Sequence, residues 1–178
     1  MIRKILLSSD PILRRKSKPV TKIDKKVTEL IKDLKDTLAI QKDPEGVGLA
    51  APQIGKNLRI FFAKYKNFEK IVINPEIIKI ESESGKKGSV KKEGKEILEG
   101  CLSLPYYYGP LKRALKVTIK YMDEKGNVVT EAFEGFHAQI IMHEIDHLEG
   151  VLFIDHLLSE GKPLYKVDGD EWEEVELI

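Results

Sequence analysis

The stretch His-Glu-Ile-Asp-His at residues 143–147 decides how this chain is organised. Residues four apart on a helix lie on one face, so His143 and His147 can hold one metal ion. Glu144 is rotated by about 100° from His143, close enough to act on a metal-bound water without ligating the metal. The flanking residues are apolar, and imidazoles and a carboxylate on a buried helix would be costly without partners. We therefore predict a buried, metal-ligating helix over residues 136–148.

The rest of the chain alternates between helical and strand patterns. Apolar residues recur at helical spacing over residues 21–42, which predicts an amphipathic helix. Residues 46–55 are mostly small and predict a flexible loop, and residues 82–95 predict a polar, glycine-rich loop. Runs rich in Ile, Val and Phe predict strands at residues 58–65, 71–74, 76–81, 116–121, 128–134, 164–167 and 171–175.

These elements predict an α+β fold. Antiparallel strands pack around a central helix that carries the metal ligands, with one amphipathic N-terminal helix. The last two strands flank Asp168-Gly169 and predict a C-terminal β-hairpin. No repeat or linker interrupts the pattern, so we expect one domain over residues 1–178.

Composition limits the classes of protein to which the chain can belong. Its 178 residues suffice for one hydrophobic core, and a 33% charged fraction is typical of a globular protein. No run approaches the roughly 18 apolar residues of a membrane span, and we do not expect the brief apolar run at the N-terminus to act as a secretory signal. A single cysteine excludes an internal disulfide. We expect a cytoplasmic protein that contacts no membrane and no specific nucleic acid sequence.

The residue pattern leaves the third metal ligand open. The only cysteine, Cys101, lies in the segment Gly-Cys-Leu-Ser-Leu-Pro, of a kind that presents one side chain to a cleft. His137 lies over a turn from the site, and His156 follows a short apolar run that reads as a strand. Asp146 suits a supporting role better than a ligand, and Glu149 is a further candidate. These observations favour Cys101 and leave the other four open.

Three blocks of sequence resemble those of the peptide deformylases. They are Gly-Val-Gly-Leu-Ala-Ala-Pro-Gln at 46–53, Glu-Gly-Cys-Leu-Ser at 99–103 and His-Glu-Ile-Asp-His-Leu-Glu-Gly at 143–150. Each block is complete, and they occur in the family's order. The resemblance implies a hydrolase that removes the N-formyl group from the N-terminal formylmethionine of newly made polypeptides and releases formate.

The resemblance also implies a role for each site residue. Cys101, His143 and His147 would bind the metal, with water in the fourth position. Glu144 would be the general base on that water, while the Leu102 backbone N–H and the Gln53 amide stabilise the oxyanion. The remaining roles are substrate binding by Val47, Gly48, Phe136 and Ile140, and structural support by Arg113 and Asp146. Because Gly48 lacks a Cβ atom, we expect the substrate backbone to approach there.

The cofactor implied is one divalent metal ion. A thiolate and two imidazoles suit iron(II), zinc, nickel or cobalt, and the resemblance points to iron(II). The partners implied are N-formylmethionyl nascent peptides. Two departures from the family pattern concern partners. Tyr108 stands where many members have a basic residue, so preference beyond the methionine is open. The acidic C-terminal segment replaces the basic helix that some members use at the ribosome, so ribosome contact is not supported.

Two other readings fit parts of the pattern. One is a general zincin-type metalloprotease, in which the third ligand usually lies downstream of the helix. The other is a catalytically silent, deformylase-like binding protein in which the metal only stabilises the fold. The presence of both Glu144 and Gln53 argues against the silent protein.

Overall fold

The structure is a computed structural model and describes residues 1–82 and 97–176. Its helices are α1 (Lys25–Ala39), α2 (Gly135–Glu149) and α3 (Phe153–Glu160), with short 3-10 turns at Pro11–Arg14 and Ala51–Ile54. Its strands are β1 (Gly48–Ala50), β2 (Ile60–Tyr65), β3 (Phe68–Glu81), β4 (Ile97–Cys101), β5 (Leu104–Leu111), β6 (Lys116–Met122), β7 (Val128–Glu134), β8 (Leu164–Asp168) and β9 (Glu171–Val175). The strands form a five-stranded sheet in the order β1-β2-β3-β6-β7 and a four-stranded sheet in the order β4-β5-β8-β9.

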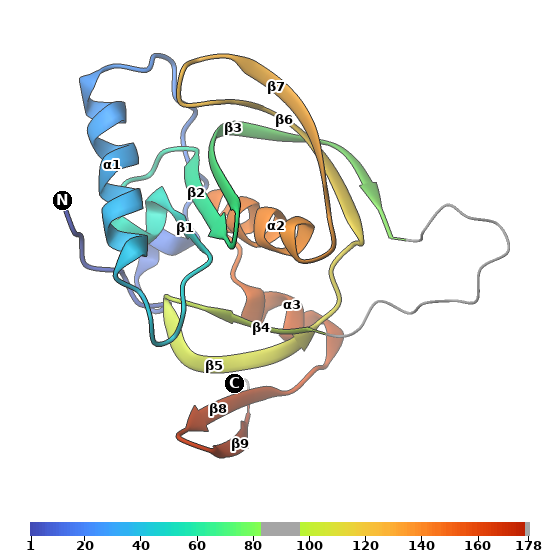
Figure 1. The fold of residues 1–178 in the computed structure, drawn as a ribbon. Helices are drawn as coiled ribbons and strands as arrows, with labels where there is room; N and C mark the ends of the chain where they lie inside the picture. Colours follow the sequence, from blue (N-terminus) through green and yellow to red (C-terminus); the bar gives the residue numbers. More distant parts are fainter. Residues whose placement is uncertain (83–96, 177–178) are drawn as a thin grey trace, which may run out of the picture.

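Helix α2 lies at the centre of the molecule, between the five-stranded sheet and β4 and β5 (Figure 1). Its residues Ile141 and Leu148 are fully buried in one cluster with Phe61 and Ala63 of β2. Since successive side chains of a strand point to opposite faces, Phe61 and Ala63 define the face of the sheet that covers α2. The residues that carry the site are therefore held on the most enclosed helix of the fold.

The opposite face of the five-stranded sheet packs against α1. Ile60 and Phe62 of β2 alternate with the residues that face α2, and they share a buried cluster with Leu34 of α1. Helix α1 begins where the side chain of Asp24 accepts a hydrogen bond from the backbone N–H of Val27 at 3.0 Å. The sheet is therefore buried on both faces near β2.

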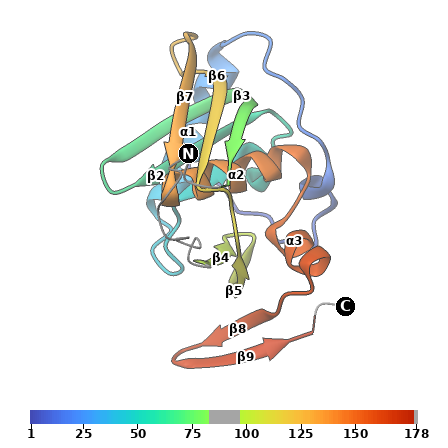
Figure 2. The same ribbon diagram turned by 90° about the vertical axis from the view of Figure 1, so that its right-hand side faces the viewer.

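The four-stranded sheet has its own small core beneath α3. Cys101, Leu111, Leu157 and Leu164 share this core, which also includes Phe153. Strand β8 pairs with β5, so the β8–β9 hairpin continues the sheet beyond the main body of the molecule (Figure 2). The core fixes the end of β4, where Cys101 lies, relative to α3.

The predicted α+β class, the central helix, the N-terminal helix and the C-terminal hairpin are confirmed. Two boundaries differ from the expectation. Helix α1 is shorter than the predicted span of residues 21–42. The predicted strands at 71–74 and 76–81 are one strand, β3, with a register shift between Ile73 and Glu76. Proline at position 75 has no N–H for the ladder, which explains the irregularity.

Two local predictions are wrong, and two strands were missed. Residues 46–55 are not a flexible loop, because Gly48 pairs with Ala63 of β2 and a 3-10 turn follows. The apolar run before His156 forms helix α3 rather than a strand, and the Asp155 carboxylate accepts from the Leu152 N–H at its start. Strands β4 and β5 were not expected, since their Gly, Pro and Tyr residues do not alternate with polar ones. The predicted loop at 82–95 falls almost entirely outside the described residues.

No helix in the described ranges is long and apolar enough to cross a membrane.

We predict that Leu157→Ala destabilises the protein by about 2–5 kcal/mol, because Leu157 is fully buried between α3 and β5. Leu158→Ala, at the next residue of the same helix, is the matched control because that side chain is 49% exposed. Chemical denaturation of both variants measures the difference. Equal free energies of unfolding would contradict the packing described for α3.

Candidate active site

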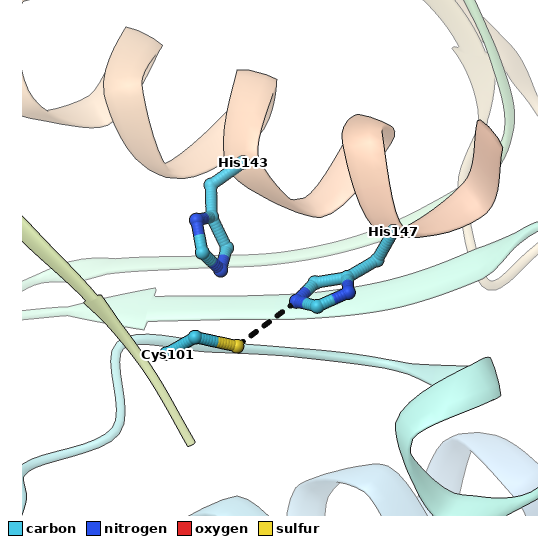
Figure 3. Close-up of side chains that lie close together, drawn as sticks. All are labelled: Cys101, His143 and His147. Atoms are coloured by element: carbon cyan, nitrogen blue, oxygen red, sulfur yellow. Dashed lines mark hydrogen bonds between the residues drawn. The ribbon is translucent and has the colours of Figure 1, made fainter. Parts of the chain in front are cut away.

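The structure brings together Cys101 at the end of β4 and the two histidines of α2. His143 and His147 project from one side of the helix toward the cysteine (Figure 3). The Cys101 Sγ atom lies 3.2 Å from Nε2 of His147, and one potential ligand atom from each residue lies within 4.8 Å of the others. Within the described ranges this is the one such group of three His, Cys, Asp or Glu residues.

The electrostatics of this group suit a cation. Burial alone would raise the pKa of the Cys101 thiol, but the imidazoles of His147 and His143 lower it well below its ordinary value. The pKa of His143 is raised, because hydrogen bonds to Cys101 and Glu99 outweigh the effect of burial. One thiolate and two imidazoles form a donor set that divalent iron, zinc, cobalt or nickel accepts. The residues present therefore fit a divalent metal ion.

The other four candidates for the third ligand have partners elsewhere. The ring of His137 stacks on that of Phe68, with centroids 4.4 Å apart. Glu149 forms ion pairs with two basic side chains. His156 Nε2 and Asp146 Oδ2 lie 2.8 Å apart in a hydrogen bond with each other. In the described structure only Cys101 joins the histidines.

Glu99 is a functional residue that the sequence did not single out. Its buried carboxylate accepts hydrogen bonds from Arg113 Nη2 at 2.6 Å, His143 Nδ1 at 2.7 Å and Gln139 Nε2 at 3.2 Å. Burial would raise the pKa of Glu99, but Arg113 and His143 lower it well below the usual range. The Nδ1 proton is thus directed to Glu99, which leaves Nε2 of His143 facing Cys101.

The one signal for Glu99 in the sequence is its place in the block Glu-Gly-Cys-Leu-Ser, because β4 was not expected as a strand. In the structure Glu99 and Cys101 both lie on β4, and their side chains contact the two histidines of α2. Arg113 also donates to Asp146 Oδ2 at 2.6 Å, which is the pair expected from the sequence. Arg113 therefore connects the strand that carries Cys101 to the helix that carries both histidines.

Gln53 is held rigidly beside the cysteine. Its Oε1 atom accepts from the backbone N–H of Ala50 at 2.8 Å, which fixes the orientation of the amide. Its Nε2 atom then points to Ser103 Oγ at 3.1 Å and to Cys101 Sγ at 3.5 Å. The side-chain amide is therefore a preorganised donor at the edge of the Cys/His/His group.

Glu144 is buried and incompletely paired. Its Oε2 atom has no hydrogen-bond partner among the residues described. Burial raises the pKa of Glu144 to about 7, although the nearby His143 and His147 act in the opposite direction. A carboxyl group with a pKa in this range can both accept and return a proton near neutral pH.

Gly48 makes room for this carboxylate. A Cβ atom at Gly48 would lie 2.1 Å from Glu144 Oε1, which is far closer than atoms can approach. The expected reason for this glycine was close approach of a substrate backbone. The structure supplies a second reason, since the space beside Gly48 is occupied by Glu144.

A cleft of about 360 Å³ opens onto this group. Besides Cys101 and His143, seven of the predicted site residues line it, namely Val47, Gly48, Gln53, Leu102, Phe136, Ile140 and Glu144. The rings of Phe136 and Tyr65 meet edge to face, with centroids 4.7 Å apart. Across the mouth, the Tyr106 hydroxyl reaches the carbonyl of Asp43 at 3.4 Å. The cleft thus offers an apolar pocket that ends at Glu144 and the Cys/His/His group.

A buried glutamate beside a Cys/His/His group, at the end of an apolar cleft, defines a hydrolase of the His-Glu-x-x-His class. The family model described as Polypeptide deformylase matches residues 2–163. The chain belongs to the polypeptide deformylase family, whose members are enzymes that act on formylated nascent peptides.

Curated relatives and solved structures agree with this membership. Peptide deformylase of Pseudothermotoga lettingae is 46% identical over 163 residues, covering 91% of this chain and 86% of the relative. Peptide deformylase 2 of Clostridium acetobutylicum is 44% identical, covering 86% of this chain and 94% of the relative. The crystal structure of the Thermotoga maritima enzyme superposes with a TM-score of 0.75 at 37% identity, covering 87% of this chain and 97% of that one.

We predict that the protein, stripped by a chelator and reloaded with cobalt(II), binds one equivalent and shows a thiolate-to-cobalt absorption band. Cys101→Ser should abolish this band and weaken cobalt binding by at least about tenfold. His137→Gln is the matched control, because this histidine of α2 stacks on Phe68 away from the group. An unchanged band in Cys101→Ser would show that the sulfur is no ligand.

Proposed function

We propose that this chain removes the N-formyl group from the formylmethionine of nascent polypeptides, using one divalent metal ion held by Cys101, His143 and His147. The observation that carries the proposal is the buried carboxylate of Glu144 beside this group, at the end of an apolar cleft. Membership of the deformylase family supports the reaction itself.

The metal is the part of the proposal that rests on donor chemistry. When bound, a divalent ion would supply Lewis-acid activation of water and of the formyl oxygen. We propose iron(II) as the native ion, while zinc, nickel and cobalt suit the same donors. A site of this kind needs reducing surroundings, and the substrate is made by ribosomes, so we propose the cytoplasm as its location.

Glu144 moves the proton in the proposed reaction. One carboxylate oxygen of Glu144 takes a proton from the attacking water. At the same time the water oxygen forms a bond to the formyl carbon. The carbon–nitrogen bond then breaks, and Glu144 returns the proton to the amino group of the methionine that leaves. The immediate products are formic acid and a peptide with a free amino terminus. The acid then releases its proton to the solvent and leaves as formate, so atoms and charge balance. General acid–base catalysis of this kind typically raises the reaction rate by about 10²–10⁴-fold.

Gln53 and Leu102 stabilise the negative charge that develops on the formyl oxygen. The Gln53 amide is oriented by Ala50 before the substrate arrives, and its Nε2 atom would turn the N–H that it directs to Cys101 Sγ toward the formyl oxygen. The backbone N–H of Leu102, next to Cys101 and on the cleft wall, is the second donor. Each donor of this kind is typically worth about 3 kcal/mol.

The substrate is proposed to bind as an added strand. Strand β1 is the edge of the five-stranded sheet, so its free side can pair with an extended peptide. The methionine side chain would enter the apolar pocket formed by Val47, Phe136 and Ile140. Arg113 and Asp146 would hold the helix and β4 in register behind the site.

The competing readings lack support from the site. The histidine downstream of the helix, His156, hydrogen-bonds Asp146 and lies outside the Cys/His/His group. A silent binding protein would have no use for an unpaired buried carboxylate, which is costly in the absence of a function. The acidic β8–β9 hairpin also argues against ribosomal RNA contact through that element.

Glu144→Gln tests the proton transfer. We expect formate release from formyl-Met-Ala to fall by about 10²–10⁴-fold, because the amide cannot accept the water proton. Metal stoichiometry, measured on the same samples, should be unchanged because Glu144 is not a ligand. Equal rates for wild type and variant would instead favour the silent binding protein.

Gly48→Ala tests the placement of Glu144. The added methyl group would displace the carboxylate, and misplacement of about 1 Å in an active site can cost about 10²-fold in rate. We expect such a loss in kcat for formyl-Met-Ala, with the cobalt absorption band retained. A variant with full activity would contradict the close contact between Gly48 and Glu144.

A further inference from the structure

The β8–β9 hairpin is built onto the wall of the cleft, although it lies beyond the residues 2–163 that the family model matches. Strand β8 pairs with β5 at Tyr108 and Tyr165. Buried Leu164 anchors the hairpin in the core under α3. Figure 2 shows the hairpin continuing outward from β5. This addition to the family fold is therefore a fixed extension of the cleft wall.

Aromatic rings connect the cleft to the hairpin. Residues that oppose each other on antiparallel strands share a face, which places Tyr108, Tyr165 and Trp172 on one side of the sheet. The ring centroids of Tyr108 and Trp172 are 5.8 Å apart, and those of Tyr165 and Trp172 are 6.4 Å apart. The Tyr108 ring also covers Gly100, where a Cβ atom would come within 2.6 Å of it. Both Tyr108 and Gly100 line the cleft.

The same face carries the negative charge of a glutamate. Glu174 opposes Tyr165 and so lies on the aromatic side of the hairpin. Within residues 1–82 and 97–176, no cationic side chain forms an ion pair with Glu174. The cation of this hairpin, Lys166, opposes Tyr107 and belongs to the other face. Trp172 is 52% exposed, so a ligand can reach its ring.

We propose that this aromatic ladder, defined as Tyr108, Tyr165, Trp172 and Glu174, selects substrates with arginine or lysine shortly after the formylmethionine. A cation attracts both aromatic faces and a carboxylate, which together favour a basic side chain over a neutral or acidic one. Tyr108 lines the cleft and its ring lies 5.8 Å from that of Trp172, so the ladder begins at the cleft wall. Because an extended peptide advances about 3.3 Å per residue, we assign this contact to residues two or three positions beyond the methionine. The inference rests on the proposed function, because it uses the same cleft.

The test compares formyl-Met-Ala-X-Ala peptides in which X is arginine, norleucine or glutamate. We expect wild-type kcat/KM to be about fivefold higher for arginine than for glutamate. Trp172→Ala and Glu174→Gln should each lower this ratio at least about twofold, and added salt should remove the part due to Glu174. Val128→Ala, at an exposed position of β7, is the control and should leave the ratio unchanged.

A second readout is independent of activity. Trp172 is the only tryptophan of the chain, so intrinsic fluorescence reports directly on the hairpin. Titration with the product peptide Met-Ala-Arg-Ala should change this fluorescence, while Met-Ala-Glu-Ala should need at least about fivefold higher concentration.

The outcomes separate the two proposals. Hydrolysis of formyl-Met-Ala with an arginine-to-glutamate ratio near one would overturn the selectivity and leave the proposed function standing. A ratio that survives both substitutions would also overturn it, because the preference would then arise elsewhere. Failure to hydrolyse any formyl peptide would overturn the proposed function and this inference together.

Discussion

The meeting of helix α2 with the end of strand β4 is the constraint on which the rest of the structure depends. Here Cys101 Sγ lies 3.2 Å from His147 Nε2, although the two residues are 46 positions apart in the sequence. Helix α2 is enclosed on one side by the five-stranded sheet and on the other by β4 and β5 (Figure 1). Both sheets must be in place before the thiol and the imidazoles can share one centre.

Hydrogen bonds between buried polar groups fix the position of α2 relative to β4. His143 would be costly on an apolar helix, and the carboxylate of Glu99 would be costly on β4, but each satisfies the other. The positive charge of Arg113 offsets the free-energy cost of burying the Glu99 carboxylate. Glu144 differs from these groups because one of its oxygens stays unpaired among the described residues. The hydrogen bonds of this region therefore hold the Cys/His/His group in place and leave unpaired the carboxylate that we propose transfers the proton.

The sequence predicts those elements whose formation depends on residues close together in the chain. The α2 helix, the Asp168-Gly169 hairpin and the α+β class follow from periodicity and turn residues. Long-range pairing determines the rest. Residues 48–50 become a strand only because β2 lies beside them, and β4 and β5 lack an alternating pattern. The third ligand stayed open for the same reason, since spacing along the chain cannot tell which distant side chain reaches α2. Family resemblance supplied Cys101, whereas the contact between Gly48 and Glu144 required coordinates.

X-ray absorption spectroscopy of the zinc-loaded protein tests the central claim most directly. The account predicts one sulfur ligand at about 2.3 Å and two imidazole nitrogens at about 2.0–2.1 Å. This result would place Cys101, His143 and His147 around a single ion. A spectrum with no sulfur ligand would contradict the account, because the protein has no other cysteine to supply a thiolate.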